Sequence, residues 1–307
     1  MTSKYNIVTI LGPTASGKTR FAVELSRRIK GEIISADSRQ VYRGMDIGTG
    51  KDIKDYEIEK VIIPSHLIDI VDAGYQYNVF EFQRDFLKSL ETIKSNKGFP
   101  VLCGGTGLYI DAALKGYKLI DVPVNLDLRK ELENKNLMEL SDVLKKYKRL
   151  HNRSDGDTVK RAIRAIEIEE YYLNNNIVEK EYPKLNSLII GIDCERELRR
   201  KRITNRLNIR LKEGLIEEVQ TLLSQGLRAE QLVYYGLEYK YITEYLTGKY
   251  SFKEFFSKLE IAIHQFAKRQ MTYFRSMEKK GTTINWINSE VPNDEKIQFV
   301  IEKFIAD

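Results

Sequence analysis

Residues 5–25 read YNIVTILGPTASGKTRFAVEL, and this stretch decides the fold. Its first seven residues, 5–11, form an apolar run with the length of a buried strand. A glycine-containing turn follows, and apolar residues then recur at helical spacing from Phe21 to Ile29. A strand, a glycine turn and a helix in this order are the context in which phosphate-binding loops occur.

The turn matches the pattern G-x-x-x-x-G-K-[ST], through Gly12, Pro13, Thr14, Ala15, Ser16, Gly17, Lys18 and Thr19. Its glycines allow backbone N–H groups to close around phosphate oxygens, and the N-terminus of the following helix adds positive potential. Lys18 can reach the terminal phosphate, and the hydroxyl of Thr19 can ligate Mg²⁺. The turn therefore predicts binding of a di- or triphosphate, but it does not say that a phosphate is transferred.

Further apolar runs predict the rest of a parallel sheet. Residues 32–37 (EIISAD) and 99–103 (FPVLC) end in polar or glycine-rich sequence, as strands buried under helices do. Between them, Asn78 and Glu81 have the spacing of a capping box at the start of an amphipathic helix. Residues 187–193 predict one more strand in an otherwise helical second half. We expect an α/β fold, a doubly wound, P-loop NTPase-like parallel sheet flanked by helices.

The length of 307 residues suits a large α/β core that carries a smaller insertion. Residues 119–157 differ from the rest because they form short, highly charged helical segments, at 128–132 and 137–150, and end in a polar loop at 152–157. We assign this stretch as a small helical insertion. The core is then expected to consist of residues 1–118 and 158–307.

Composition sets broad limits on function. The formal net charge of +6 favours a polyanionic partner only weakly, because many basic proteins bind no nucleic acid. Cys103 and Cys194 fit neither a disulfide framework nor a metal-ligand spacing, so we expect reduced, structural thiols. The chain has neither a signal-like start nor a run of about 18 apolar residues. We therefore expect a cytoplasmic protein that does not bind a membrane.

Polar residues follow the other predicted strands. In a doubly wound sheet, the carboxyl ends of the strands form the ligand crevice, so Asp37 is expected near the phosphate loop. This carboxylate is a candidate general base, and a helix cap or a water-mediated Mg²⁺ ligand are equally good interpretations. Thr106 lies in a glycine-rich turn, residues 104–107, which either admits a ligand or is a plain connection.

Two helices carry basic residues. Lys160, Arg161 and Arg164 lie opposite an apolar stripe, and such a face is usually solvated. A second stripe lines one side of a helix and can bind a diphosphate or an RNA backbone: Arg199, Arg202, Arg206 and Arg210. The aromatic residues at 234–245 and 266–274 are expected to pack between helices rather than to stack on bases.

Together these segments resemble the transfer RNA dimethylallyltransferase family over nearly the whole chain. A generic P-loop kinase would share only the phosphate loop. The stretches most specific to the family are residues 12–19, 37–42 (DSRQVY), 45–49 (MDIGT), 104–109 (GGTGLY) and 267–275 (AKRQMTYFR).

The resemblance implies a prenyltransferase that moves a dimethylallyl group from dimethylallyl diphosphate to an adenine of tRNA. The acceptor would be the exocyclic N6 amine of the adenine just 3′ of the anticodon, and the products N6-isopentenyladenosine and diphosphate. The resemblance assigns Asp37 as the base, Lys18 and Arg206 to the diphosphate, and Thr19 to Mg²⁺. We expect a monomer that binds the anticodon stem-loop through the insertion and through Asp37, Ser38, Arg39, Gln40, Thr106, Lys160, Arg161, Ala162, Ile163 and Arg164.

The chain departs from the family pattern in a few places. Asp52 follows Lys51 where proline is common, Asn208 replaces an aspartate, Leu237-Glu238 replaces tyrosine and lysine, and the insertion is short. Three other functions remain open: a small-molecule kinase, a prenyltransferase acting on free adenine nucleotide, and a non-catalytic RNA-binding switch gated by nucleotide. The two basic helices favour RNA over a free nucleotide as the acceptor.

Overall fold

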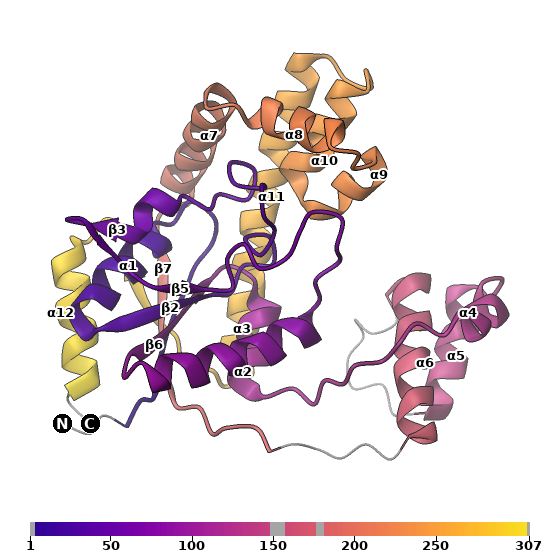
Figure 1. Ribbon diagram of the computed structural model, residues 1–307, viewed down its shortest axis with the longest axis horizontal. Coiled ribbons are helices and arrows are strands. Elements are labelled where there is room, and N and C mark those ends of the chain that lie inside the picture. The colour runs from indigo at the N-terminus through magenta and orange to yellow at the C-terminus, as the bar shows by residue number, and fades with distance from the viewer. Residues whose placement is uncertain (1–3, 148–156, 176–180, 306–307) are drawn as a thin grey trace. The chain divides into compact units, whose positions relative to one another are not determined.

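The computed structural model describes residues 4–147, 157–175 and 181–305 (Figure 1). The chain divides into two compact units. The first, which we call the core unit, comprises Met1–Tyr117 and Pro183–Asp307. The second, the insertion unit, comprises Lys118–Tyr182.

A parallel sheet forms the centre of the core unit. Within the described residues it has six strands in the order β5-β2-β6-β1-β7-β8, and each neighbouring pair is parallel. In β1, Val8 pairs with Val101 on one side and with Leu188 on the other, and every residue of this strand is buried. The strands are β1 (Ile7–Leu11), β2 (Gly31–Ser35), β5 (Ser65–His66), β6 (Phe99–Gly104), β7 (Ser187–Asp193) and β8 (Asn285–Asn288).

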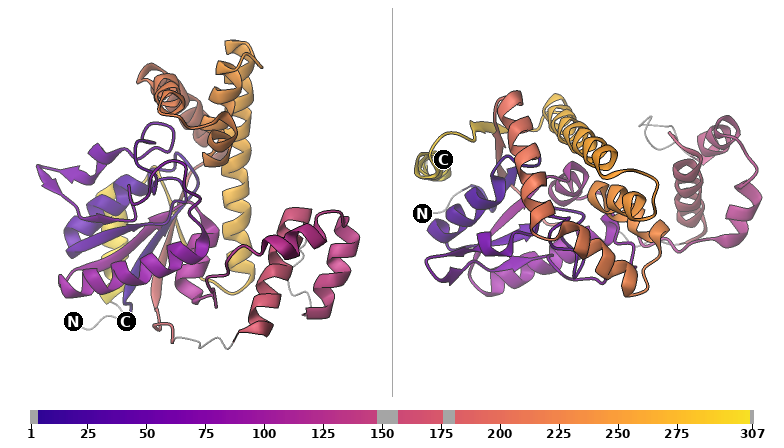
Figure 2. Two further views of the ribbon diagram at one scale, coloured as in Figure 1. Left: turned by 45° about the vertical axis from the view of Figure 1, so that its right-hand side comes forward. Right: turned by 90° about the horizontal axis from the view of Figure 1, so that it is seen from above.

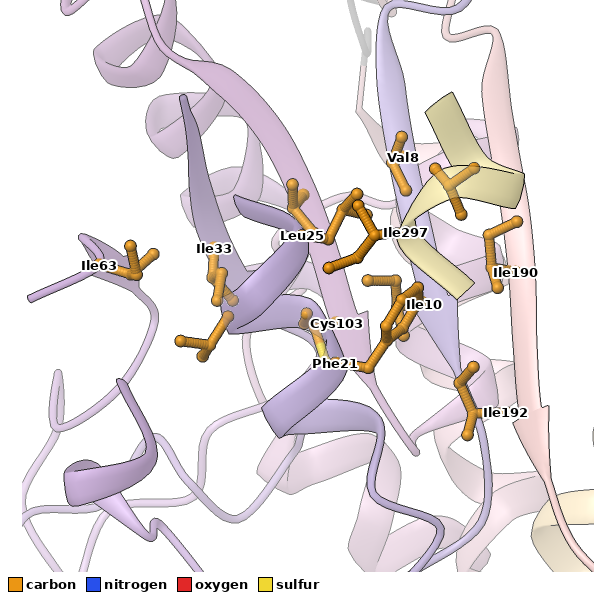
Figure 3. Close-up of a cluster of buried hydrophobic side chains, with 14 of the residues drawn as sticks. Val8, Ile10, Phe21, Leu25, Ile33, Ile63, Cys103, Ile190, Ile192 and Ile297 are labelled. Atoms are coloured by element: carbon orange, nitrogen blue, oxygen red, sulfur yellow. The ribbon is translucent and has the colours of Figure 1, made fainter. Parts of the chain in front are cut away.

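Helices cover both faces of this sheet. On one face, α1 (Lys18–Ile29) and α12 (Asn293–Ile305) pack Phe21, Leu25 and Ile297 against the strands, as Figure 3 shows. On the other face lie α2 (Val79–Ser95) and α3 (Gly107–Lys115), as Figure 2 shows. The Phe82 ring of α2 stacks on the Tyr109 ring of α3 with centroids 4.2 Å apart. Burying each large side chain of this kind contributes about 1.5–3 kcal/mol. The predicted α/β architecture is confirmed.

The remaining elements of the core unit follow β2 and β7. After β2 come a 3₁₀ turn, η1 (Ile53–Tyr56), and a hairpin of β3 (Glu57–Ile58) and β4 (Val61–Ile62). None of the helices in the described ranges has the length and apolar character needed to cross a membrane. A helical group follows β7: α7 (Arg196–Lys212), α8 (Leu215–Ser224), α9 (Ala229–Leu232), η3 (Val233–Tyr235), α10 (Leu237–Leu246) and α11 (Phe252–Lys279). In Figure 1, α8, α9 and α10 lie beyond the carboxyl ends of the strands, whereas the long helix α11 begins there and continues alongside the sheet.

The insertion unit contains three described helices, α4 (Leu126–Leu132), α5 (Leu137–Tyr147) and α6 (Val159–Asn174). The buried carboxylate of Glu167 accepts hydrogen bonds from Arg129, from Arg164 and from the backbone N–H of Asn125, at 2.6–2.9 Å. The small apolar core of the insertion unit consists of Leu128, Leu132, Leu140, Leu144, Ala162 and Ile166.

The boundary of the insertion differs from the one expected at residue 157. The helix α6 supplies Ala162 and Ile166 to the small core, so the unit extends to Tyr182. The apolar stripe of α6 shows that one side of the helix is buried, but its spacing does not say against which unit that side packs. Part of the predicted helix, residues 148–150, and most of the polar loop, 152–156, lie outside the described residues.

Most predicted elements of the core unit agree with the structure to within two residues. The capping box is present, because Asn78 accepts the backbone N–H of Glu81 and the Glu81 carboxylate accepts that of Asn78. The strand β8 was missed, and the second half is therefore less purely helical than expected. The strand β8 has only four residues, with asparagine at both ends, and therefore contains no apolar run of strand length. Cys103 and Cys194 are buried and free, as predicted.

Candidate active site

The loops that follow β1, β2 and β6 open onto one cavity of about 560 Å³ in the core unit. On the sheet side the lining includes the phosphate loop, residues 37–40 and residues 104–108. On the helical side it includes residues of α7, residues 233–238, Lys240 and residues of α11. The predicted crevice at the carboxyl edge of the sheet is therefore present, and the helical group closes it from the other side.

The phosphate loop has the backbone geometry that its sequence predicts. Gly17 has φ +83° and directly precedes α1, and Ala15 also lies in the left-handed region at φ +60°. A Cβ on Gly12 would lie 2.4 Å from the carbonyl oxygen of Ile192, so only glycine fits there. Such a turn directs successive N–H groups to one point and forms an anion-binding concavity.

Lys18 lies half-buried at the start of α1 and lines the cavity. Burial lowers the pKa of its ammonium group, and the positive charge of Arg206 acts in the same direction, whereas Asp37 opposes both. Burial also raises the pKa of the nearby Cys103 thiol to about 12, so this group is neutral at physiological pH. Asp37 is therefore the carboxylate that offsets the charge of Lys18.

Asp37 and the three residues after it line the cavity. The Asp37 carboxylate accepts the backbone N–H of Arg39 at 2.9 Å, and the N–H of Ser38 donates to the Thr106 hydroxyl at 3.2 Å. Gln40 donates to the carbonyl of Gly50 at 3.0 Å. The structure thus brings Asp37, Ser38, Arg39, Gln40 and Thr106 together at one site.

Two arginines of the second basic stripe line the cavity. Arg206 donates to the Asp52 carboxylate at 2.8 Å, and Arg210 lies 3.8 Å from the same oxygen. Burial lowers the pKa of Arg210 to about 10, which still leaves it charged near neutral pH. Arg206 and Arg210 also border a recess of about 20 Å³ next to the phosphate loop.

The other half of this stripe has a different role. Arg199 pairs with Asp193 at 2.6 Å, and Arg202 donates to the Ser289 hydroxyl at 2.6 Å. These contacts connect α7 to the ends of the strands. The spacing of the four arginines predicted one helical face correctly, but it could not separate the pair that lines the cavity from the pair that contacts the strand ends.

Sequence reasoning did not single out Gln270 of α11 within its family motif. Its side chain accepts the backbone N–H of Thr14 at 2.9 Å and donates to the carbonyl of Gly105 at 2.9 Å. It therefore joins the phosphate loop to the glycine-rich turn before Thr106. No local sequence pattern could have predicted this bridge, because its partners are 256 and 165 residues away.

Glu238 is a second residue of the site whose position the sequence did not predict, because there it was only a departure from the family pattern. It lines the cavity and borders the small recess beside Arg210. Burial raises the pKa of its carboxyl group, and the charge of Arg210 opposes that effect. An acidic group therefore lines the same cavity and recess as Arg206 and Arg210.

The aromatic residues divide between packing and lining. Tyr235 is buried against Tyr42, with ring centroids 4.7 Å apart, and the buried Tyr239 donates its hydroxyl to Glu218 at 2.7 Å. The expectation of helix packing is confirmed for these two. Tyr235 also lines the cavity, together with Tyr234 and Phe266, and the Arg39 guanidinium lies 5.0 Å from the Tyr234 ring centroid.

The predicted RNA-binding residues of α6 have mixed environments within the insertion unit. Lys160 and Arg161 are exposed, although Arg161 lies 3.6 Å from Asp157. Ala162 is buried and Ile163 packs against the small core. Arg164 is held by Glu167 at 2.6 Å and by the carbonyl of Val122 at 2.7 Å. Of the five residues, Lys160 and Arg161 are thus the most accessible to a ligand.

The charges around the cavity favour an anion. Basic side chains outnumber acidic ones in the lining, and such an excess raises the local concentration of a negatively charged ligand. The basic residues are Lys18, Arg39, Arg206, Arg210, Lys240 and Arg269, and the acidic ones are Asp37 and Glu238.

Known proteins resemble this chain over nearly its full length. The family model described as IPP transferase matches residues 40–277, and that described as isopentenyl transferase matches residues 5–62. The tRNA dimethylallyltransferase 2 of Bacteroides fragilis is 61% identical over 299 residues, which are 97% of this chain and 98% of that protein. The tRNA dimethylallyltransferase 2 of Porphyromonas gingivalis is 56% identical over 300 residues, 98% of this chain and 99% of its own.

A solved structure agrees with these relatives. The crystal structure of the full-length tRNA isopentenylpyrophosphate transferase from Bacillus halodurans matches with a TM-score of 0.71 and 34% identity, covering 98% of this chain and 97% of that one. The first family match includes Arg206 and Gln270, and the second includes the phosphate loop and Asp37. By these matches and by the cavity at its sheet edge, the chain belongs to the IPP transferase family.

Proposed function

We propose that this protein transfers a dimethylallyl group from dimethylallyl diphosphate to the N6 amine of the adenine just 3′ of the anticodon in tRNA. The products are N6-isopentenyladenosine and diphosphate. One observation carries the proposal: the phosphate loop, Arg206 and Asp37 line a single cavity. The names of the relatives from Bacteroides fragilis and Porphyromonas gingivalis support the same reaction.

The reaction needs an anion site for the leaving group and a proton acceptor for the nucleophile. The adenine N6 forms a bond to C1 of the dimethylallyl group, and the bond between C1 and the diphosphate oxygen breaks. Lys18 and Arg206 stabilise the negative charge that develops on the departing diphosphate. Asp37 takes the proton that N6 loses, which lowers the barrier for a poorly nucleophilic amine.

The chain also suits Mg²⁺ bound together with a diphosphate. Within the described ranges, no group of three or more histidine, cysteine or acidic side chains could hold a metal by itself. Mg²⁺ commonly uses one or two protein oxygens and completes its coordination with phosphate oxygens and water. The Thr19 hydroxyl, which lines the cavity, would be such a ligand, and the ion would neutralise charge on the leaving diphosphate.

The acceptor adenine must leave its stack to enter the cavity, at a cost of a few kcal/mol. Ser38, Arg39 and Thr106 lie beside Asp37 and offer polar contacts to its edge, while Tyr234 and Phe266 offer aromatic surface. Lys160 and Arg161 add exposed positive charge in the insertion unit for the RNA backbone.

A mass measurement tests this function. We would incubate the protein with unmodified tRNA, dimethylallyl diphosphate and Mg²⁺, digest the RNA and weigh the nucleosides. The proposal expects a gain of one C5H8 unit on a single adenosine. Transfer or hydrolysis of the ATP γ-phosphate without prenylation would instead establish a kinase, and prenylation of free AMP but not of tRNA would move the acceptor to a nucleotide.

A further inference from the structure

The arginines that face the anion site already hold a carboxylate of the chain itself. Asp52 lies immediately before η1, and one of its oxygens is 2.8 Å from Arg206 Nη2 and 3.8 Å from Arg210 Nη2. The Asp52 side chain is 51% exposed, whereas those of Arg206 and Arg210 are 32% and 10% exposed. The carboxylate thus approaches the pair from the solvent side, while both arginines reach inward to the cavity.

The backbone that carries Asp52 is firmly held. The Glu218 carboxylate accepts the N–H groups of Asp46, Ile47 and Gly48 at 2.7–3.0 Å. The ammonium group of Lys51 is buried, donates to the carbonyl of Tyr42 and pairs with Asp46 at 2.7 Å.

At Gly50 the loop backbone lies so close to Arg206 and Arg210 that there is no room for a side chain. A Cβ at this position would lie 1.9 Å from Arg210 Nη2 and 2.4 Å from Arg206 Nη2. The side-chain torsions of Asp52 can move its carboxylate toward the arginines or away from them while the backbone before it stays in place.

We propose that Asp52 is a built-in competitor for the diphosphate and thereby sets the affinity of the enzyme for the prenyl donor and for the diphosphate product. This inference rests on the function proposed above. A diphosphate carries several negative charges and can accept from both guanidinium groups, so it displaces a single half-exposed carboxylate. The displaced carboxylate turns to water at low cost, because exposed ion pairs contribute little to stability. When diphosphate leaves, Asp52 pairs with Arg206 again.

A supporting role for Asp52, in place of a competing one, predicts the opposite change in diphosphate affinity when its charge is removed. If Asp52 instead held Arg206 in the geometry that binds diphosphate, removing its charge would weaken binding. If Asp52 competes, removing its charge strengthens binding. The direction of the change therefore decides between the two roles.

The test compares Asp52→Asn with the wild-type protein by titration calorimetry with inorganic pyrophosphate in the presence of Mg²⁺. Asparagine has the same shape, and the Asp52 side chain makes no capping bond to η1, so the fold should be kept. We expect the Kd for pyrophosphate to fall about two- to fivefold. Product inhibition by pyrophosphate should strengthen and the KM for dimethylallyl diphosphate should fall by a similar factor. The difference in pyrophosphate affinity between Asp52→Asn and the wild-type protein should shrink as the salt concentration rises from about 0.05 to about 0.5 M.

Glu57→Gln is the matched control, because it removes the same charge from an exposed residue on the adjacent strand β3. It should leave the Kd for pyrophosphate unchanged, and an equal gain in this variant would reduce the effect to net charge and overturn the proposal. A double-mutant cycle supplies the second readout: the gain from Asp52→Asn should disappear in an Arg206→Gln background.

The outcomes separate this inference from the proposed function. A wild-type protein that neither prenylates tRNA nor binds pyrophosphate would overturn both. A wild-type protein that prenylates tRNA, together with an Asp52→Asn variant of equal or lower pyrophosphate affinity, would overturn only the role of Asp52 as a competitor.

Discussion

Replacing Gly50 by alanine should damage donor binding far more than it damages folding. The new Cβ would meet the terminal nitrogens of Arg210 and Arg206 at 1.9 and 2.4 Å, well inside van der Waals contact. These nitrogens end flexible side chains, so the guanidinium groups would move and the fold would remain. Displacing binding groups by about 1 Å can cost about 10²-fold in rate. We expect kcat/KM for dimethylallyl diphosphate to fall by about this factor.

The backbone adds a smaller and separable cost. Gly50 has φ +69°, and a non-glycine residue in this region costs about 1 kcal/mol. For a unit of this size, that lowers Tm by about 2–4 °C. Gly44 provides a control with the same φ of +69°, and a Cβ there would meet no other atom within 4 Å, so Gly44→Ala carries the strain without the collision.

Steady-state kinetics and thermal melts on the two variants complete the test. Gly44→Ala should lose a similar amount of Tm and keep its KM for the donor, while Gly50→Ala should lose donor affinity as well. Equal kinetic losses in both variants would show that strain alone is responsible. A normal donor KM in Gly50→Ala would mean that Arg206 and Arg210 do not hold the diphosphate.

Other substitutions test the site and the insertion unit separately. Asp37→Asn keeps an acceptor for the Arg39 N–H but removes the base, so single-turnover prenylation should slow about 10²-fold or more while tRNA affinity in filter binding changes little; an unchanged rate would exclude the role. Arg206→Gln should raise the KM for the donor about tenfold or more, and an effect confined to tRNA binding would move this arginine to the RNA. Burial tends to raise the pKa of Glu167, but hydrogen bonds from Arg129 and Arg164 outweigh it and leave the pKa lowered. A lowered folded-state pKa gives stability that is present above the unfolded pKa and is lost as pH falls through the folded pKa. The hydrogen-exchange protection factors of α4 and α6 in the full chain, corrected for the intrinsic pH dependence of amide exchange, should therefore fall below about pH 4.5, and Glu167→Gln should flatten that dependence.

Much of the core unit could be predicted because its signals are local. The phosphate loop, the strands at 32–37 and 99–103 and the capping box at Asn78 each depend on residues within one turn or strand. The loops then meet at one cavity because the carboxyl ends of parallel strands share an edge. Asp37 and Lys18 could be placed together from this rule alone.

The features that sequence reasoning missed depend on tertiary contacts. The strand β8 is short, has polar ends and exists because it pairs with β7. The grouping of α6 with α4 and α5 depends on Ala162 and Ile166 meeting leucines of those helices. The division of the arginine stripe depends on Asp52 and Asp193, which lie on other elements. No spacing rule within α7 contains that information.

The bridge made by Gln270 limits how α11 can vary. This helix has 28 residues, and its glutamine must meet Thr14 and Gly105 at the same time. An inserted residue between the helix start and Gln270 would rotate everything beyond it by about 100° relative to the preceding turns. The glutamine would then keep its place only if the first half of α11 turned instead and pulled Phe255 and Leu259 out of their buried positions. Length changes should consequently be confined to the connections before Phe252 and after Lys279, and α11 should behave as a part of fixed length in this enzyme.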